Sequence, residues 1–131
     1  MPKPRVLIAE DEPMVAMDLE ATVREITSAE IVVVASVSGA RRAMAAPLDF
    51  AFLNIEVTDG KTFEIALELQ RNEVPFVFVS DSRSEALPPE LRSAPFIPKP
   101  FDKRQIERVL RNTLAKSGAA TGHRLGGSWF Q

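Results

Sequence analysis

The 131-residue sequence contains no cysteine and no tyrosine, and its single histidine, His123, lies close to the C-terminus. The absence of cysteine excludes disulfide bonds, thiol nucleophiles and thiolate metal sites. One imidazole near the end of the chain also argues against a Ser-His-Asp triad, a histidine-rich zinc site and a histidine phosphoacceptor. The residues left for chemistry are carboxylates, hydroxyls and lysines.

Glycine is scarce in the body of the chain, and long apolar runs are absent. Only Gly39 and Gly60 precede residue 117, so the sequence can form neither a dinucleotide-binding fingerprint nor a phosphate-binding P-loop. No apolar run reaches the roughly 18 residues of a membrane span, and the N-terminus lacks the core of a signal peptide. We therefore expect a cytoplasmic protein that does not engage a membrane.

The length and composition are those of a single globular domain. A chain of 131 residues has room for one substantial core. Hydrophobic residues make up 45% of the chain, charged residues 26%, and the net charge is −2. This balance predicts a soluble domain and gives no reason to expect a nucleic-acid partner.

Short apolar runs alternate with helical patterns along the chain. The expected strands are residues 5–9, 31–35, 50–53, 75–80 and 96–98, and the expected helices are residues 13–26, 38–46, 63–69 and 102–116. Ser38 is the predicted N-cap of the second helix, and Asp102 with Gln105 resembles a capping box. Pro88 and Pro89 predict only a short or broken helix between residues 83 and 92.

This alternation predicts an α/β domain over residues 1–116 and a flexible C-terminal tail over residues 117–131. Right-handed crossovers favour a doubly wound, five-stranded parallel sheet with helices on both faces, flavodoxin-like with strand order 2-1-3-4-5. Ligands of such sheets bind beyond the carboxyl ends of the strands. The polar residues that follow the strands are expected to share one crevice there, and they are Glu10, Asp11, Asn54, Ser80 and Lys99.

Two carboxylates, an amide, a hydroxyl and an ammonium group suit a hard divalent cation and a phosphoryl oxygen. Through Glu10-Asp11, Ser80 and Lys99-Pro100-Phe101, residues 4–116 resemble the receiver domain of bacterial two-component response regulators. The fragments PFVFVS, LPPELR and PFIPKPF are similar to single-domain regulators whose fourth strand reads PFxFATGY, although Ser80-Asp81-Ser82 stands where that subgroup has Thr-Gly-Tyr.

The resemblance implies a magnesium site beside a phosphoacceptor. Glu10 and Asp11 match the family's metal-binding acidic pair, and the Asn54 side chain and the backbone carbonyl of Glu56 are further implied ligands of a weak magnesium site. Asn54, in FLNIEVTDG, stands at the position of the family's phosphoacceptor aspartate. A neutral amide is a far weaker nucleophile than a carboxylate. We therefore expect no phosphorylation at this position and, with one negative charge fewer, only weak Mg²⁺ binding.

The resemblance also implies three residues that respond to phosphorylation in the family. Ser80 matches the switch hydroxyl, Phe96 the aromatic switch position and Lys99 the phosphate-pairing lysine. Without an aspartate at position 54, Lys99 is expected to turn to Glu10 or Asp11. With no phosphoryl group to bind, Ser80 and Phe96 are expected to keep one rotamer state set by packing.

The predicted function is that of a degenerate receiver in two-component phosphorelay signalling, not an enzyme. It would associate with a sensor histidine kinase or a downstream signalling protein, and a homodimer stays open. Three alternatives remain: phosphorylation on Glu56 or Asp59, an engineered Asp-to-Asn change at residue 54 in a competent receiver, and a flavodoxin-like small-molecule binder. In a simpler interpretation, the acidic run at residues 10–12 only caps a helix. The Trp129-Phe130 pair either docks on the domain or on a partner, or is disordered.

Overall fold

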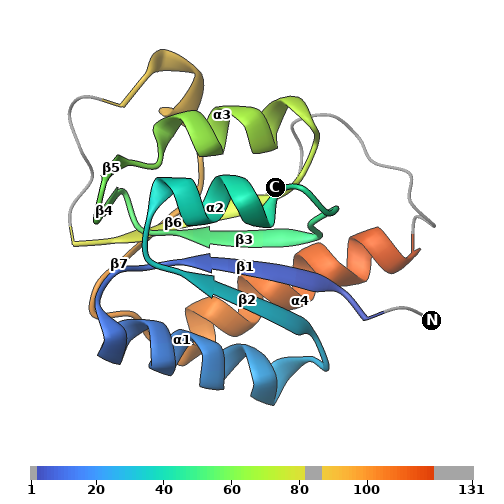
Figure 1. Ribbon diagram of the computed structural model, residues 1–131. Helices are drawn as coiled ribbons and strands as arrows, with labels where there is room; N and C mark the ends of the chain where they lie inside the picture. Colours follow the sequence, from blue (N-terminus) through green and yellow to red (C-terminus); the bar gives the residue numbers. More distant parts are fainter. Residues whose placement is uncertain (1–2, 82–86, 120–131) are drawn as a thin grey trace.

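The computed structural model describes residues 3–81 and 87–119, which form an α/β domain (Figure 1). The elements in chain order are β1 (Arg5–Ala9), α1 (Pro13–Ile26), β2 (Glu30–Val34), α2 (Val37–Ala43), β3 (Phe50–Leu53), β4 (Glu56–Val57), β5 (Gly60–Lys61), α3 (Phe63–Arg71), β6 (Phe76–Ser80), a 3₁₀ turn (Pro89–Leu91), β7 (Phe96–Pro98) and α4 (Lys103–Ala119). No helix of the described residues is long and apolar enough to cross a bilayer.

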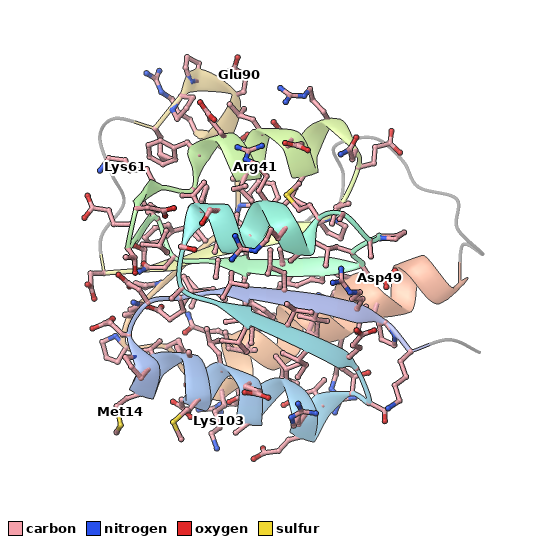
Figure 2. The ribbon with its side chains drawn as sticks, in the orientation of Figure 1. Met14, Arg41, Asp49, Lys61, Glu90 and Lys103 are labelled. Carbon is pink, nitrogen blue, oxygen red and sulfur yellow. The ribbon has the colours of Figure 1, made fainter. Side chains whose placement is uncertain are left out.

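Five parallel strands form the main sheet, in the order β2-β1-β3-β6-β7. This is the predicted order 2-1-3-4-5, once the small β4–β5 hairpin is set apart, and the prediction of the fold is confirmed. Helices α1 and α4 cover one face of the sheet and α2 and α3 cover the other (Figure 1). Arg41 bridges α2 to α3 by pairing with Glu64 and Glu68 (Figure 2).

The core is divided by the sheet into two apolar layers. Because side chains of a strand alternate between faces, Leu7 and Phe78 pack toward α2 and α3, whereas Ile8 and Phe52 pack toward α1 and α4. The central strand β3 is buried along its whole length. The edge strand β2 is only partly buried, and Val33 is 41% exposed.

The N-cap of helix α2 lies two residues earlier than the sequence predicts. Its N-cap is Ser36, whose Oγ accepts a hydrogen bond from the Gly39 backbone N–H at 2.9 Å. The backbone N–H groups of Val37 and Ser38 donate to Asp59 from the β4–β5 turn, at 2.6 and 3.2 Å. Ser38 therefore lies inside the first turn of the helix instead of capping it.

Replacing Ser36 with alanine is expected to destabilise the domain by about 1 kcal/mol, the usual cost of removing an N-cap side chain. The matched control is Ser38→Ala, since the Ser38 hydroxyl contacts Ser36 Oγ at 3.3 Å and lies outside the cap bond. That control should cost less than about 0.5 kcal/mol, as most surface substitutions do. Urea unfolding of both variants measures the difference, and a larger loss in Ser38→Ala would reverse the assignment of the cap.

Helix α4 begins with the predicted capping box. The Asp102 backbone N–H donates to Gln105 Oε1 at 2.9 Å, and Asp102 Oδ1 accepts from the Arg104 N–H at 2.8 Å. The helix continues to Ala119, three residues beyond the predicted end at Lys116. The rest of the predicted tail, with His123 and Trp129-Phe130, lies outside the described residues. Positions 83–86 of the predicted short helix also lie outside them, and residues 89–91 form a 3₁₀ turn.

Candidate functional site

The polar residues predicted to meet beyond the strands do lie together at one end of the sheet. Glu10 follows β1, Asn54 follows β3, Ser80 is the last residue of β6, and Lys99 follows β7. The strands β1 and β3 point toward the side of the molecule where α1 begins and the β4–β5 hairpin lies (Figure 1). Backbone hydrogen bonds tie these strand ends together: Asn54 N–H donates to Ala9 O, and Lys99 N–H donates to Ser80 O, each at 2.9 Å.

A polar cavity of about 450 Å³ opens at this edge of the sheet. Three of the predicted residues beside it are almost fully buried: Glu10 is 3% exposed, Ser80 7% and Asn54 9%. The residues that line the cavity are Asp11, Glu12, Asn54, Ile55, Glu56, Ser80 and Asp81. The cavity wall therefore combines exposed carboxylates with a buried amide and hydroxyl.

The Asn54 side chain lies at the centre of this cluster, and its two ends face different partners. Its Nδ2 donates to the Glu56 backbone carbonyl at 2.7 Å and approaches Glu10 Oε2 at 3.3 Å and Asp11 Oδ1 at 3.5 Å. These three neighbours are acceptors, and an amide nitrogen is a donor only. The opposite end, Oδ1, accepts a hydrogen bond from Ser80 Oγ at 3.0 Å. The neighbours thus fix which way the amide faces.

Thr62 holds the loop that carries Asn54. Its side chain is fully buried, and its Oγ1 donates to the Asn54 backbone carbonyl at 2.8 Å. The Thr62 N–H also donates to Ile55 O at 2.9 Å. Thr62 could not be identified from the sequence, because a threonine just before a helix is common and nothing in the local pattern indicates that its hydroxyl turns back toward residue 54.

The Lys99 ammonium group pairs with two carboxylates of the acidic run. Its Nζ lies 2.9 Å from Glu10 Oε1 and 2.8 Å from Glu12 Oε1, and the Lys99 side chain is 7% exposed. The predicted turn of Lys99 to Glu10 is confirmed, and its second partner is Glu12 instead of Asp11. Glu12 occupies the N-cap position of α1 but makes no side-chain cap bond. The acidic run therefore binds Lys99 through Glu10 and Glu12, and the Glu12 side chain does not cap α1.

Burial and pairing shift the pKa values of the ion pair. Burial raises the pKa of the Glu10 carboxyl, although the Lys99 ammonium and the Glu12 N–H act against that rise. Burial acts to lower the pKa of Lys99, but its hydrogen bonds to Glu10 and Glu12 outweigh this and raise it. Because the pKa of Lys99 is raised on folding, the stability from this pairing is complete below lysine's ordinary pKa and is lost as pH rises through the raised value.

Several solved structures resemble this chain, and receiver domains are among them. The solution structure of SdrG from Sphingomonas melonis Fr1 superposes with a TM-score of 0.70 at 28% identity, covering 86% of this chain and 97% of that one. The PhyR response regulator REC domain from Erythrobacter litoralis gives 0.73 at 23% identity, covering 88% and 92%. The signal receiver domain of a putative Luxo repressor protein from Vibrio parahaemolyticus gives 0.75 at 17% identity, covering 91% and 95%.

The chain has the receiver-domain fold. Neither a protein-family model nor a curated protein sequence matches it. The assignment of the fold therefore depends on the strand order and on the structural superpositions, which extend over at least 86% of this chain in the three comparisons above.

Within this receiver fold, the oxygens implied as magnesium ligands are already engaged. Mg²⁺ requires close to octahedral oxygen contacts at about 2.0–2.1 Å. The Asn54 Nδ2 contacts the three oxygens concerned, Glu10 Oε2, Asp11 Oδ1 and Glu56 O. Among residues 3–81 and 87–119, no three acidic, histidine or cysteine side chains are arranged to hold a metal ion. As they are arranged, these residues do not fit a magnesium ion unless the amide moves away.

The two carboxylates considered as alternative phosphoacceptors bind other groups. The Glu56 carboxylate pairs with Lys61 across the β4–β5 hairpin, which lowers the pKa of Glu56. Asp59 accepts two backbone N–H bonds at the start of α2, and the bond from Val37 is the main reason why the pKa of Asp59 is lowered. Of these two residues, Glu56 is the one that contacts the Asn54 side chain, and it does so through its backbone carbonyl and not its carboxylate.

Phe96, the implied aromatic switch residue, lies apart from the polar cluster. It is the first residue of β7, where it pairs in register with Phe78 of β6. Its half-buried ring packs against the apolar layer between the sheet and helices α2 and α3. The structure therefore brings together Glu10, Asp11, Asn54, Ser80 and Lys99, and positions Phe96 on the neighbouring apolar surface.

Proposed function

We propose that this protein is a degenerate receiver that acts by association with a protein partner and is not phosphorylated at residue 54. One observation carries the proposal. Asn54, with a neutral amide, lies at the centre of the crevice, between the acidic residues on one side and Ser80 on the other. A carboxylate at that point would supply the anionic nucleophile that phosphoryl transfer needs, and an amide oxygen does not.

The hydrogen bonds around Asn54 support a single signalling state. Ser80 donates to Asn54 Oδ1 at 3.0 Å, so its hydroxyl is held toward residue 54 without a phosphoryl group. Lys99 is held by Glu10 and Glu12. A ligand shifts a conformational equilibrium only through different affinities for the two states. With no phosphoryl group to bind, the output surface keeps one conformation and its partner is bound constitutively.

The partner in this proposal is a sensor histidine kinase or a downstream signalling protein in the cytoplasm, and a second copy of the chain is the alternative. The fragments PFVFVS and PFIPKPF support kinship with single-domain regulators of the PFxFATGY type. The protein itself catalyses no reaction in this proposal. Mg²⁺ binds weakly, because Glu10, Asp11 and the Glu56 carbonyl become available to it only when the Asn54 amide moves.

The proposal is tested by incubating the protein with MgCl₂ and a small-molecule phosphodonor, followed by intact mass measurement. We expect no covalent adduct. A stoichiometric phosphoryl adduct would overturn the proposal, and peptide mapping would then identify its position. Label on Glu56 or Asp59 would favour the phosphorylatable alternative, although both side chains now bind other groups. A flavin-like absorbance in the purified protein would instead favour a flavodoxin-like binder.

A further inference from the structure

We propose that the Asn54 amide nitrogen replaces a divalent cation in this crevice, holding the acidic residues together so that metal and amide compete for the same oxygens. This inference rests on the assignment of Asn54 to the acceptor position in the proposed function. It concerns how the crevice is stabilised, and it is independent of whether a partner binds constitutively.

The position of the nitrogen carries the argument. Nδ2 lies 2.7 Å from the Glu56 carbonyl, 3.3 Å from Glu10 Oε2 and 3.5 Å from Asp11 Oδ1. These oxygens come from two separate segments, one after β1 and one after β3, and the nitrogen is their common neighbour. Hard divalent cations in proteins are bound by such sets of carboxylate and carbonyl oxygens. The amide nitrogen therefore occupies the point where a cation would have to sit.

The charges around the cluster are consistent with this role. Glu10, Asp11 and Glu12 are consecutive carboxylates, and such a group is destabilised by mutual repulsion unless positive charge lies close to it. Lys99 supplies that charge to Glu10 and Glu12. The partial positive charge of the Asn54 amide hydrogens faces the other side of the cluster, toward Glu10 Oε2 and Asp11 Oδ1. Together the two groups offset part of the negative charge of the cluster without metal.

The opposite model makes Asn54 a metal ligand through Oδ1. That oxygen, however, accepts the Ser80 hydrogen bond and faces away from the acidic oxygens. The two models predict opposite effects of removing the side chain. If Nδ2 competes with the cation, Asn54→Ala increases the affinity for a divalent cation. If Oδ1 is a ligand, the same variant decreases it.

The test is a titration of the full chain with Mn²⁺, a probe for Mg²⁺, read by water-proton relaxation. The variants are Asn54→Ala and Asn54→Asp, with Asn112→Asp on the exposed face of α4 as the charge-matched control. We expect Asn54→Ala to bind Mn²⁺ about tenfold more tightly than the unmodified protein, the factor that one displaced hydrogen bond corresponds to. Asn54→Asp should bind more tightly still, and Asn112→Asp should be unchanged.

Thermal unfolding in EDTA and in MgCl₂, at an ionic strength matched with KCl, gives a second measurement. In EDTA, Asn54→Ala and Asn54→Asp should both melt below the unmodified protein, because Glu10 Oε2 and Asp11 Oδ1 lose the Asn54 amide donor. MgCl₂ should raise the melting temperature of both variants more than that of the unmodified protein.

Equal or weaker Mn²⁺ binding by Asn54→Ala would overturn the inference. If that variant does not fold, Asn54→Ser, which also removes Nδ2, takes its place with the same expected direction. Equal or weaker Mn²⁺ binding by either variant would contradict this inference and would leave the proposed function untouched. The proposed function is decided by the mass of the unmodified protein after exposure to a phosphodonor, and that measurement involves none of these variants.

Discussion

Asn54→Asp is expected to make the protein phosphorylatable, giving a single covalent adduct with a small phosphodonor where the unmodified protein gives none. In the structure, Oδ1 of residue 54 already lies 3.0 Å from Ser80 Oγ, and Lys99 lies on the neighbouring carboxylate. A carboxylate at residue 54 would place an anionic oxygen beside the Ser80 hydroxyl. The rate of labelling should rise by a factor of roughly 10⁴ or more, since removing an enzyme's nucleophile costs up to about 10⁶-fold.

The labelling of Asn54→Asp should depend on MgCl₂. A fourth carboxylate beside Glu10, Asp11 and Glu12 adds like charge that Lys99 alone does not neutralise. Intact mass measured over time, with and without EDTA, gives both results. Peptide mapping must place the adduct on residue 54. If Asn54→Asp stays unlabelled while remaining folded, the crevice lacks more than a carboxylate at residue 54, and its interpretation as a receiver site is wrong.

A double variant separates chemistry from packing. Asn54→Asp combined with Ser80→Ala removes the hydroxyl that now bonds Oδ1 and leaves the acidic residues in place. We expect it to be labelled on residue 54 more slowly than Asn54→Asp alone, because a hydroxyl beside the acceptor can donate to the transferring phosphoryl group, where a donor stabilises the transition state. Equal rates would mean that Ser80 serves packing only.

The sequence was sufficient to predict the strand order and the residues that meet beyond the strands. The reason is physical: buried parallel strands are continuous apolar runs, and each ends at the polar residue that enters the crevice. Glu10, Asn54, Ser80 and Lys99 each directly follow or end such a run. Their meeting therefore requires only the correct order of strands.

The details that the sequence did not predict depend on contacts between distant residues. Ser36 and Ser38 are equally good N-caps by residue type. In the structure the helix starts at Val37, and the backbone N–H groups of Val37 and Ser38 donate to Asp59, which lies more than twenty residues away in the sequence. The β4–β5 hairpin has no counterpart among the predicted strands, because two-residue strands leave no periodicity to detect. The choice of Glu12 over Asp11 as a partner of Lys99 likewise depends on how α1 begins relative to β7.

Lys99→Met is expected to cause the largest loss of stability among the crevice variants. The Glu10 carboxylate, 3% exposed, would lose the ammonium group 2.9 Å away. Removing one partner of a buried ion pair costs about 3–5 kcal/mol. Water can reach the cluster through the open cavity beside Glu12, so we expect a loss of about 3 kcal/mol, at the lower end of that range. Lys103→Met is the control, since Lys103 is exposed and lies 3.9 Å from Glu25; it should cost less than about 1 kcal/mol.

The double variant Lys99→Met/Glu10→Gln should recover much of the loss, because it removes the unpaired charge together with its partner. The loss of stability in Lys99→Met should also depend on pH. Burial already raises the pKa of Glu10, and without Lys99 that pKa rises further. A carboxyl whose pKa is raised on folding favours the folded state when protonated, so the defect of Lys99→Met should shrink as pH falls through the pKa of Glu10. Urea unfolding across this pH range measures the loss of unfolding free energy in Lys99→Met. A loss that does not change with pH would mean that the variant is destabilised by lost packing of the lysine stem and not by the unpaired charge of Glu10.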